Sequence, residues 1–337
     1  MPEQKKPSEP KKMAAVTVIA NPLAKANDKV LIFQSGDVNL ALRVSSRSLI
    51  DFNARASMGP KSTEVVGHKL TVPSQLVSMV YQDTVTVYGI TGQEVADLKV
   101  EMLSPVQACV GENGLKPITG VLAGCAQPDG ERGWLYFITK DDDGNTKIGE
   151  WVLSEQGPKM NYLDLADFSP DTNLYAVYDE AQKKRWLILQ QSDDTVIIYD
   201  PANNKKFDVS ESDTRVMSNT PLAVTIIPGN EEKKRECRIV IYFVSVLDKK
   251  LKKKRLLSAN AVLGGKTITF EEPEEQPRVV KSSDDSETVV KDWAGLSAYL
   301  DTPRERVVVF GLTTKEEGRE ATFQAIQHPW KRLTDSK

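Results

Sequence analysis

The sequence has few of the residues on which several classes of protein depend. Among 337 residues there are two histidines and three cysteines. The cysteines Cys109, Cys125 and Cys237 form no CxxC pair, so we expect buried free thiols rather than a disulfide framework or a zinc site. His68 and His328 lie far apart, no nucleophile motif accompanies them, and we interpret both as surface or loop residues. A histidine-based hydrolase is therefore not expected.

Charge of one sign and long apolar runs are also missing. The 44 basic and 47 acidic residues give a net charge of −3, whereas a nucleic-acid-binding surface would need a strong basic excess. No run of 18 apolar residues exists, so no transmembrane helix is predicted. The first residues, MPEQKKPSEPKK, lack the apolar segment of a signal peptide. We therefore expect a cytoplasmic protein; a leader preceding this sequence would instead make it a secreted one.

Metal and phosphate motifs are absent as well. KDDDGN at 140–145 lacks the distal glutamate of a calcium loop, and the Asp-Gly turn of a hairpin explains it better. VLGGKT at 262–267 lacks the first glycine of a phosphate-binding loop, so we interpret it as a turn. The sequence predicts no metal and no cofactor. The expected partners are small molecules, and the oligomeric state stays open, a homodimer included.

Short strand-like runs rich in Val, Ile, Tyr and Thr fill the chain instead, among them TVTVYGI, WLILQQ and RIVIYFVSV. A Leu-Ala-type strand, a loop, an apolar strand, a turn and a further strand recur six times, at intervals of roughly 45 to 75 residues. One small sheet cannot bury both faces, but six sheets packed radially can. The prediction is an all-β, six-bladed β-propeller over residues 13–330, with a pair of β-sandwiches as the alternative.

Three segments are expected to lie outside the blades. Residues 1–12 are charged and Pro-rich, which is typical of a disordered tail. Residues 331–337 form a C-terminal tail. The acidic, polar stretch around 271–288 is interpreted as an exposed loop between the last two units.

The third unit, GVLAGCAQPDGERGWLYFITKDDDGNTKIGEWVL, is the best preserved copy of the repeat. Its order L-A-A … R-x-Y-F-Q … K-I-x-E resembles the fungal fucose-specific lectins, which are six-bladed propellers, and the resemblance spans about residues 13–330. In that family an Arg and a Glu bond the sugar hydroxyls, while an aromatic ring packs on the apolar sugar face. The resemblance places Glu150 and Glu320 at the Glu position, and Asp97 or Glu94 near it in the second unit.

The other units depart from the lectin pattern at this acceptor. Leu42, Ile198 and Lys253 stand at the Glu position of the first, fourth and fifth units. Because an unmatched buried polar partner costs about 1–3 kcal/mol, a lectin would not easily discard half of its acceptors. The sequence therefore favours the lectin scaffold without most of the lectin sites.

The arginine is also displaced. Trp134 stands where the lectin arginine is expected, and Arg132 lies two residues earlier. Arg238 and Arg306 are displaced by about two residues and Arg185 by about one. A shift of two residues keeps a side chain on the same face of a strand, so a site here would be remodelled rather than lost. The change from a cation to an indole is what a pocket for an apolar ligand would need.

The chain is similar to a second branch of these propellers, fungal hetero-Diels–Alderases of secondary metabolism. These join an o-quinone methide, derived from a tropolone or a phenol, to a humulene-type sesquiterpene olefin without a cofactor. Orientation lowers a bimolecular barrier by about 7–11 kcal/mol in favourable cases, and a donor aimed at the heterodiene oxygen adds about 3 kcal/mol. From the sequence we favour this pericyclase function over a fucose-binding lectin with one to three surviving sites, or an interaction-only propeller.

The candidate site residues follow from the repeat. Four arginines that each precede an apolar strand are the candidate hydrogen-bond donors, and hence the candidate catalytic residues: Arg132, Arg185, Arg238 and Arg306. The candidate substrate-binding residues lie in or beside the repeated units: Trp134, Tyr136, Glu150, Trp151, Trp186, Tyr199, Trp293 and Tyr299.

Overall fold

The protein is described by a computed structural model, and the description covers most of the predicted repeats. It comprises residues 15–22, 29–35, 43–48, 57–58, 64–65, 70, 75–111, 114–209, 216–230, 236–246, 254–264, 267–270, 278–279, 289–290, 293–313 and 322–330. The two predicted tails, His68 and Glu320 lie outside these residues.

The described residues form β-strands, and they contain no α-helix, only short 3-10 turns such as η2 (Val95–Asp97) and η4 (Thr302–Arg304). Each sheet is an antiparallel meander. In chain order the first three sheets consist of β1 (Ala15–Ala20), β2 (Lys29–Ser35), β3 (Arg43–Ser48) and β5 (Glu64–Val65); β6 (Val77–Tyr81), β7 (Thr84–Thr91), β8 (Lys99–Ser104) and β9 (Ala108–Cys109); and β10 (Leu122–Ala126), β11 (Gly133–Lys140), β12 (Thr146–Leu153) and β13 (Lys159–Leu163).

The second half of the chain repeats the arrangement. The fourth, fifth and sixth sheets consist of β14 (Tyr175–Asp179), β15 (Lys184–Gln190), β16 (Val196–Asp200) and β17 (Lys205–Asp208); β18 (Ala223–Ile227), β19 (Arg238–Val244), β20 (Lys254–Gly264), β21 (Thr267–Phe270), β22 (Arg278–Val279) and β23 (Val289–Val290); and β24 (Trp293–Asp301), β25 (Arg306–Thr313), β26 (Thr322–Pro329) and β4 (Ser57–Met58).

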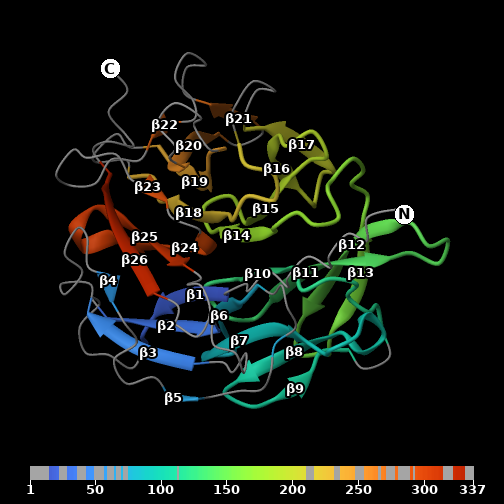
Figure 1. The fold of residues 1–337 in the computed structure, drawn as a ribbon. Helices are drawn as coiled ribbons and strands as arrows, with labels where there is room; N and C mark the ends of the chain where they lie inside the picture. The colour runs from blue at the N-terminus through green and yellow to red at the C-terminus, as the bar shows by residue number, and fades with distance from the viewer. Residues whose placement is uncertain are drawn as a thin grey trace, which may run out of the picture.

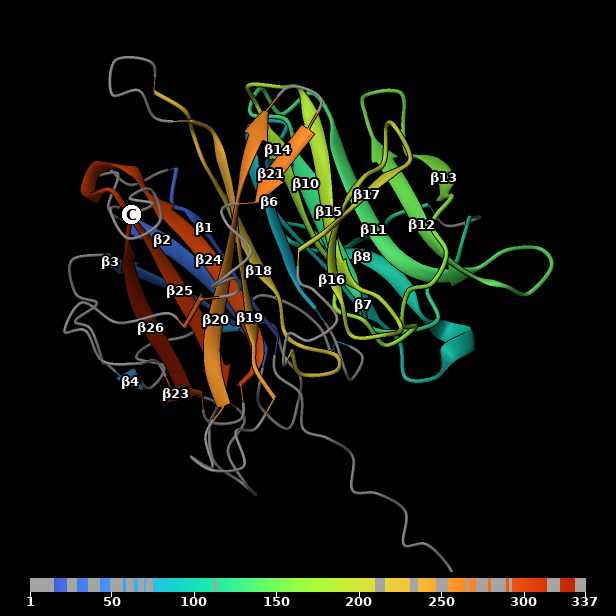
Figure 2. The same cartoon turned by 90° about the horizontal axis from the view of Figure 1, so that it is seen from above.

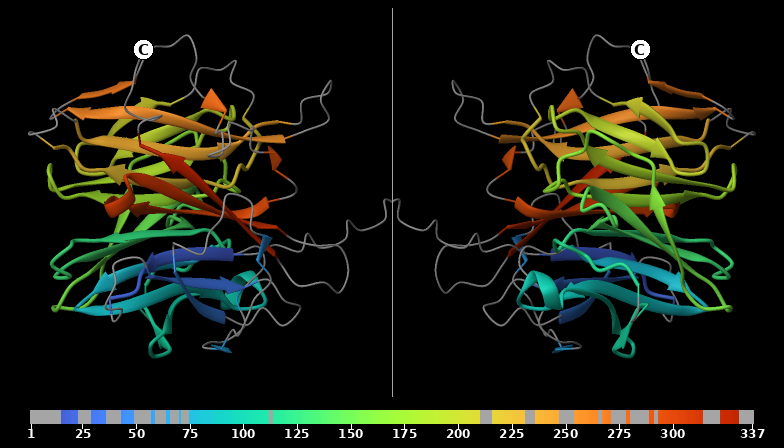
Figure 3. Two further views of the ribbon diagram at one scale, coloured as in Figure 1. Left: turned by 90° about the vertical axis from the view of Figure 1, so that its left-hand side faces the viewer. Right: turned by 90° about the vertical axis from the view of Figure 1, so that its right-hand side faces the viewer.

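The sheets are arranged in a ring. Their first strands contact one another in the cyclic order β1, β6, β10, β14, β18, β24, and β24 returns to β1. Figure 1 shows these six strands around the centre of the molecule, with the later strands of each sheet farther out. The turned views in Figure 2 and Figure 3 show neighbouring sheets lying face to face. The fold is therefore an all-β propeller, and the alternative of two β-sandwiches is wrong.

Five sheets have four strands, as expected of the blades, but the fifth sheet in chain order has six. The reason is the length of β20, which has 11 residues. One edge of β20 pairs with β19, and successive stretches of the other edge pair with β21, β22 and β23. Three short strands thus share the place of one outer strand. One of them, β22, lies inside the segment predicted as a loop around 271–288.

Each sheet is apolar on both faces because it packs between two others. Along β11, Trp134, Tyr136 and Ile138 face the fourth sheet. Leu135 and Phe137 point to the opposite face, toward the second sheet. Alternate residues of a strand point to opposite faces, so burial on both sides requires an almost continuous apolar run such as GWLYFIT. This burial explains why the sequence showed apolar runs rather than strict alternation.

A strand from the N-terminal part of the chain joins the last sheet of the ring. β4, from the N-terminal part of the chain, pairs antiparallel with β26 of the last sheet. Met58 lies opposite Phe323, and Ser57 lies opposite Gln324. The N-terminal part of the chain therefore contributes to the last sheet as well as to the first.

Two local predictions have clear outcomes. The Asp-Gly turn is confirmed, since the backbone N–H of Asp141 donates to the carbonyl of Asn145 between β11 and β12. The surface interpretation of His328 is wrong, because this residue is 5% exposed on β26 and its Nδ1 lies 3.1 Å from the hydroxyl of Tyr242 in the fifth sheet.

Candidate functional site

The candidate site lies where the third sheet meets the fourth. Its acidic group is Glu150, on β12 directly opposite Tyr136 of β11. Both side chains face the fourth sheet and are buried. A carboxylate in such a place needs hydrogen-bond partners, because an isolated buried charge is strongly unfavourable.

The main partner of Glu150 is Arg185, the second residue of β15 in the fourth sheet. Nη1 of Arg185 forms an ion pair with Oε1 of Glu150 and donates to the hydroxyl oxygen of Tyr136 at 3.3 Å. The Arg185 side chain is 17% exposed and that of Glu150 is 5% exposed. The ion pair therefore links two sheets, and solvent reaches it only from the arginine side.

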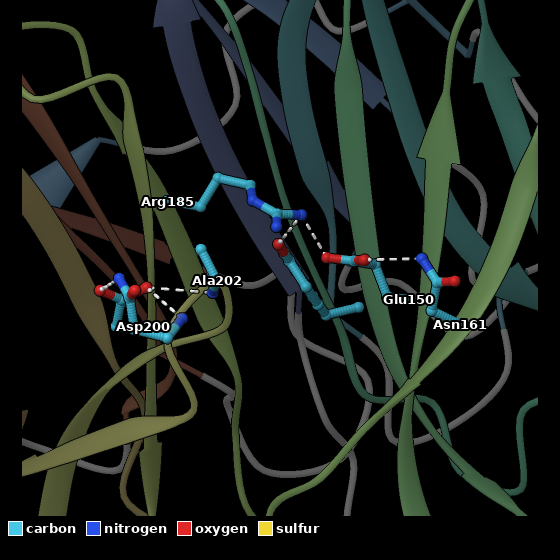
Figure 4. A network of polar contacts seen from close by, with 7 residues as sticks. Glu150, Asn161, Arg185, Asp200 and Ala202 are labelled. Carbon is cyan, nitrogen blue, oxygen red and sulfur yellow. Dashed lines mark hydrogen bonds and ion pairs between the residues drawn. The ribbon is translucent and has the colours of Figure 1, made fainter.

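The second carboxylate oxygen is held within the third sheet. Nδ2 of Asn161 on β13 donates to Oε2 of Glu150 at 3.1 Å. Figure 4 shows Glu150 between Arg185 on one side and Asn161 on the other. Both oxygens are thus fixed in position, which makes the carboxylate a preorganised acceptor.

One aromatic ring contacts the guanidinium, and a second ring stacks on the first. Cζ of Arg185 lies 4.8 Å from the ring centroid of Trp134, in the geometry of a cation–π contact. Trp134 in turn stacks on Tyr178 of β14, with centroids 5.7 Å apart and planes 7° from parallel. Nε2 of Gln127 donates to the Tyr178 hydroxyl at 3.3 Å. Cation, carboxylate and indole therefore meet in one cluster.

The surroundings keep the neutral hydrogen-bonding groups neutral. Burial, with the nearby Glu150 charge as a smaller cause, raises the pKa of the Tyr136 hydroxyl well above its usual value. Burial also raises the pKa of the Cys125 thiol to about 12, although Arg185 works in the opposite direction. Burial alone would lower the pKa of Arg185, but Tyr136 and Glu150 outweigh it and the pKa is raised. Arg185 is thus a permanently charged donor.

Arg185 also has N–H donors that could bind a ligand. Its hydrogen bonds to Tyr136 and Glu150 both use Nη1, and within the described part of the chain Nε and Nη2 have no protein partner. A guanidinium carries five N–H donors. Those of Nε and Nη2 can therefore serve a hydroxyl or carbonyl oxygen that approaches from the solvent side.

A second buried carboxylate lies one sheet farther along the ring. Asp200 at the end of β16 is 3.5 Å from Nζ of Lys184, which itself lies 5.4 Å from the ring centroid of Trp186. However, Oδ1 of Asp200 accepts from the backbone N–H of Ala202 and Asn203, and Oδ2 accepts from the Asn203 side chain. Figure 4 shows the contact with Ala202. Asp200 therefore fixes the turn after β16.

The cluster brings together five of the predicted site residues. Trp134, Tyr136, Glu150, Arg185 and Tyr199 all lie at the interface of the third and fourth sheets. Tyr199 donates its hydroxyl hydrogen to Oδ1 of Asn204 at 2.9 Å. Trp134 stands at the expected arginine position, and Arg185 from the next sheet places its guanidinium on that indole.

The other predicted aromatic residues are distributed around the ring. Trp151 faces the second sheet, against Gly111 and Gly114, where a Cβ on either glycine would come within 2.3 Å of the indole. Trp186 lies between the fourth and fifth sheets, and Tyr299 between the sixth and the first. Trp293 begins β24, but its side chain is outside the described part.

The remaining predicted arginines do not approach the site either. Arg132 is exposed in the loop before β11. Arg238 is buried on β19 and lies 3.7 Å from the carboxylate of Glu236. Arg306 donates from Nε to Oδ2 of Asp301 at 2.8 Å in the sixth sheet. Of the four candidate donors, only Arg185 meets the aromatic cluster.

Sequence reasoning missed Asn161, Tyr178 and Asp200. Asp200 could have been found from the sequence. It lies two residues beyond Ile198, the residue at the lectin Glu position, on the same face of the strand, and a shift of two residues was accepted for the arginines. Tyr178 and Asn161 carried none, because their contacts depend on how two sheets pack and on the outermost strand.

The described part of the chain contains no group of three or more His, Cys, Asp or Glu side chains placed to hold a metal ion. It also contains no helix of the length and hydropathy needed to cross a membrane.

Comparison with known sequences gives distant relatives only. No family model matches the chain. The wall-associated proteinase of Coccidioides immitis is 26% identical over 238 residues, which cover 68% of this chain and 74% of that protein. The wall-associated proteinase of Coccidioides posadasii is 25% identical over the same length. At this identity the relatives do not define a family for the chain.

Comparison with solved structures is more informative about the fold. AofleA from Arthrobotrys oligospora is 14% identical, with a TM-score of 0.61 over 97% of this chain and 85% of its own. The fucose-specific lectin from Aleuria aurantia, a six-bladed β-propeller, is 13% identical, with a TM-score of 0.55 over 96% and 97%. SapL1 lectin, solved with α-methyl fucoside, has a TM-score of 0.58 at 11% identity over 94% and 96%. The chain therefore has the fold of the fungal fucose-specific lectin-like propellers.

Proposed function

We propose that this protein binds a small polyhydroxylated ligand of the fucose type at the interface of its third and fourth sheets. The observation that carries the proposal is the cluster of Glu150, Arg185 and Trp134, which unites an acceptor, a donor and an aromatic ring. We also propose that the six-stranded sheet, the fifth in chain order, is itself a blade, so that the propeller has six blades. Its strand β18 contacts both β14 and β24, the inner strands of the two neighbouring sheets.

The chemistry of the cluster suits vicinal hydroxyls. One hydroxyl can accept from Nε or Nη2 of Arg185, and its neighbour can donate to a remaining lone pair of the Glu150 carboxylate. Hydrogen bonds to charged groups contribute about 1.5–3 kcal/mol each. The ligand approaches from the side of Arg185, since this is the more exposed partner.

The experiment is a titration with methyl α-L-fucoside, followed by calorimetry and by tryptophan fluorescence. We expect saturable binding by the wild type, and loss of at least about tenfold in affinity in Arg185→Met and Glu150→Gln, which corresponds to one lost hydrogen bond to a charged group. Arg306→Met is the matched control, because it breaks an arginine–aspartate pair in the sixth sheet. Circular dichroism confirms that each variant is folded.

Two outcomes contradict the proposal. One is the absence of saturable binding by the wild type. The other is unchanged affinity in folded Arg185→Met, which would mean that the sugar binds elsewhere.

A second candidate function uses the same residues. In the pericyclase hypothesis, Arg185 donates a hydrogen bond to the carbonyl oxygen of an o-quinone methide while Trp134 and Tyr178 offer aromatic surface. The cycloaddition converts three π bonds into one C–C σ bond, one C–O σ bond and one new π bond, with no leaving group and no proton transfer. The observation that favours it is the pair of unused donors, Nε and Nη2, beside stacked aromatic rings.

The test compares the rate and stereochemistry of adduct formation from a quinone-methide precursor and a humulene-type olefin, with and without protein. We expect a faster, stereoselective reaction that Arg185→Met slows by about 100-fold and Arg306→Met leaves unchanged, as for loss of one oxyanion donor. A product mixture that matches the uncatalysed reaction would rule this candidate out.

A further inference from the structure

A cavity of about 400 Å³ lies at the centre of the ring. The inner strands β1, β6, β10, β14, β18 and β24 all contribute to its wall, so it is framed by the whole propeller rather than by one pair of sheets. Figure 1 looks down on the arrangement of these strands. Its volume falls in the range of about 300–1,000 Å³ that is usual for small-molecule sites.

Several small residues line this space. Ala15 on β1, Ala123 and Gly124 on β10, and Ala176 on β14 all line the cavity. A Cβ at Gly124 would already meet Leu135 and Val77 at 2.8 Å, so the inner strands approach their neighbours closely. Small side chains at these places let the inner strands pack closely against the neighbouring sheets around the cavity.

The wall is uncharged. None of the described residues that line the cavity is Asp, Glu, Lys, Arg or His. Its polar side chains are largely occupied by one another: Oγ1 of Thr17 lies 2.7 Å from Oγ of Ser78, and Gln75 bonds the backbone of Leu122 and Leu174. A charged ligand would lose its hydration there without a counter-charge. The wall is thus selective for neutral molecules.

One directional contact remains available. Tyr178 lines the cavity, and its oxygen accepts from Nε2 of Gln127 at 3.3 Å. Within the described part of the chain no acceptor takes the Tyr178 hydroxyl hydrogen, which is therefore free to donate. The inner strands are also the edge strands of their sheets, so they present backbone polar groups that lack a neighbouring strand toward the centre.

From these observations we infer that the central cavity is a second binding site, for a small uncharged molecule with an apolar ring body and a hydrogen-bond acceptor for Tyr178. This site is distinct from the Glu150–Arg185 cluster, although Tyr178 stacks on Trp134 and so connects the two. The inference stands independently of the proposed function.

The experiment compares two probes with the same rings, 2-naphthol and 2-naphthoate, by calorimetry at pH 7. We expect saturable binding of the neutral naphthol and affinity at least about tenfold weaker for the carboxylate, whose burial is unfavourable. Tyr178→Phe should weaken naphthol binding roughly three- to tenfold through loss of one hydrogen bond.

Two further variants locate the site. Val80 lines the cavity and lies outside the clusters that pack between sheets, so Val80→Phe should obstruct the cavity and weaken naphthol binding at least about tenfold. Val106→Phe is the matched control, because Val106 is 64% exposed away from the cavity and its replacement should leave binding unchanged.

Three results would overturn the inference: no saturable binding of naphthol, equal affinity for naphthol and naphthoate, or unchanged affinity in Val80→Phe. Glu150→Gln separates this inference from the proposed function. It should weaken fucoside binding at least about tenfold and leave naphthol binding intact, so either property can fail without the other.

Discussion

At the scale of single residues, the pair of Glu150 and Arg185 shows how a buried charge is accommodated in this fold. The carboxylate is held by an arginine from one sheet and by an asparagine from another strand of its own sheet. Breaking a buried pair by removing one partner is costly, because the other charge stays behind without compensation. The cluster should therefore contribute to stability as well as to binding.

A double-mutant cycle measures this contribution. We expect Glu150→Gln and Arg185→Met each to lower the free energy of unfolding by about 1–3 kcal/mol, and the double variant to lose clearly less than the sum, because each single change already removes the ion pair. Urea unfolding followed by circular dichroism supplies the values. Additive losses would show that the two side chains do not depend on each other.

Cys125 gives a prediction about reactivity. Burial raises the pKa of its thiol to about 12, so at pH 8 the native protein should hold it as the unreactive thiol. Iodoacetamide labelling with mass spectrometry should modify the half-buried Cys109 first and leave Cys125 unmodified until the protein is unfolded in urea. Labelling of native Cys125 at a rate similar to that of Cys109 would contradict the burial argument.

The same shift has a consequence for stability at high pH. Because the folded pKa lies above the ordinary value of 9.0, the folded state keeps the proton that the unfolded state releases between about pH 9 and 12. The thiol's contribution is therefore complete below pH 9 and is lost as the pH rises toward 12. In urea titrations, the wild type should lose stability relative to Cys125→Ala over this interval. A constant difference would mean that the thiol titrates normally.

The residue scale also shows where sequence reasoning reached its limit. Glu150 was identified because its position within the third unit is local. Arg185 was also named as a candidate donor, but its pairing with Glu150 was not predicted, because Arg185 belongs to the next unit and reaches Glu150 only through the packing of one sheet on another. Trp134 was interpreted as a replacement for a cation, and nothing in the sequence indicated that the guanidinium of Arg185, from the neighbouring sheet, lies over its indole.

At the scale of elements, the inner strand β10 is constrained most tightly at Gly124. A Cβ there would lie 2.8 Å from the Trp134 carbonyl oxygen and equally close to two buried side chains. We expect Gly124→Ala to lower the free energy of unfolding by about 1–3 kcal/mol through overpacking. Gly133→Ala is the matched control, since the nearest atoms there are at 3.4 Å and no strain is expected. Equal unfolding midpoints in urea for the two variants would contradict this reading.

The elements themselves were largely predictable. Runs of apolar, β-branched residues between turns predicted the second and third strands of the sheets, because burial on both faces makes those runs almost continuous. The short outer strands β21, β22 and β23 were not predicted. They pair with β20 through backbone hydrogen bonds, which leave little trace in the order of side chains.

At the scale of the whole molecule, closure of the ring couples the sheets. Each sheet packs against two neighbours, and β4 ties the N-terminal part of the chain to the last sheet. Removal of one sheet would expose apolar faces on both of its neighbours, so partly unfolded rings should be poorly populated. We expect urea unfolding to give a single transition, with coincident midpoints by tryptophan fluorescence and far-UV circular dichroism. Two separated midpoints would show that part of the ring unfolds by itself.

The ring also decides which strand edges other chains can reach. An edge strand with unpaired backbone groups is a template for strand addition and aggregation. Here the inner edges of β1, β6, β10, β14, β18 and β24 all point into a space of about 400 Å³ that the ring itself encloses. A small molecule can enter that space, but a β-strand from another protein would not find room to align there. By turning one edge of every sheet toward the same enclosed centre, the chain protects those edges from intermolecular β-pairing without needing charged or proline gatekeepers on its inner strands.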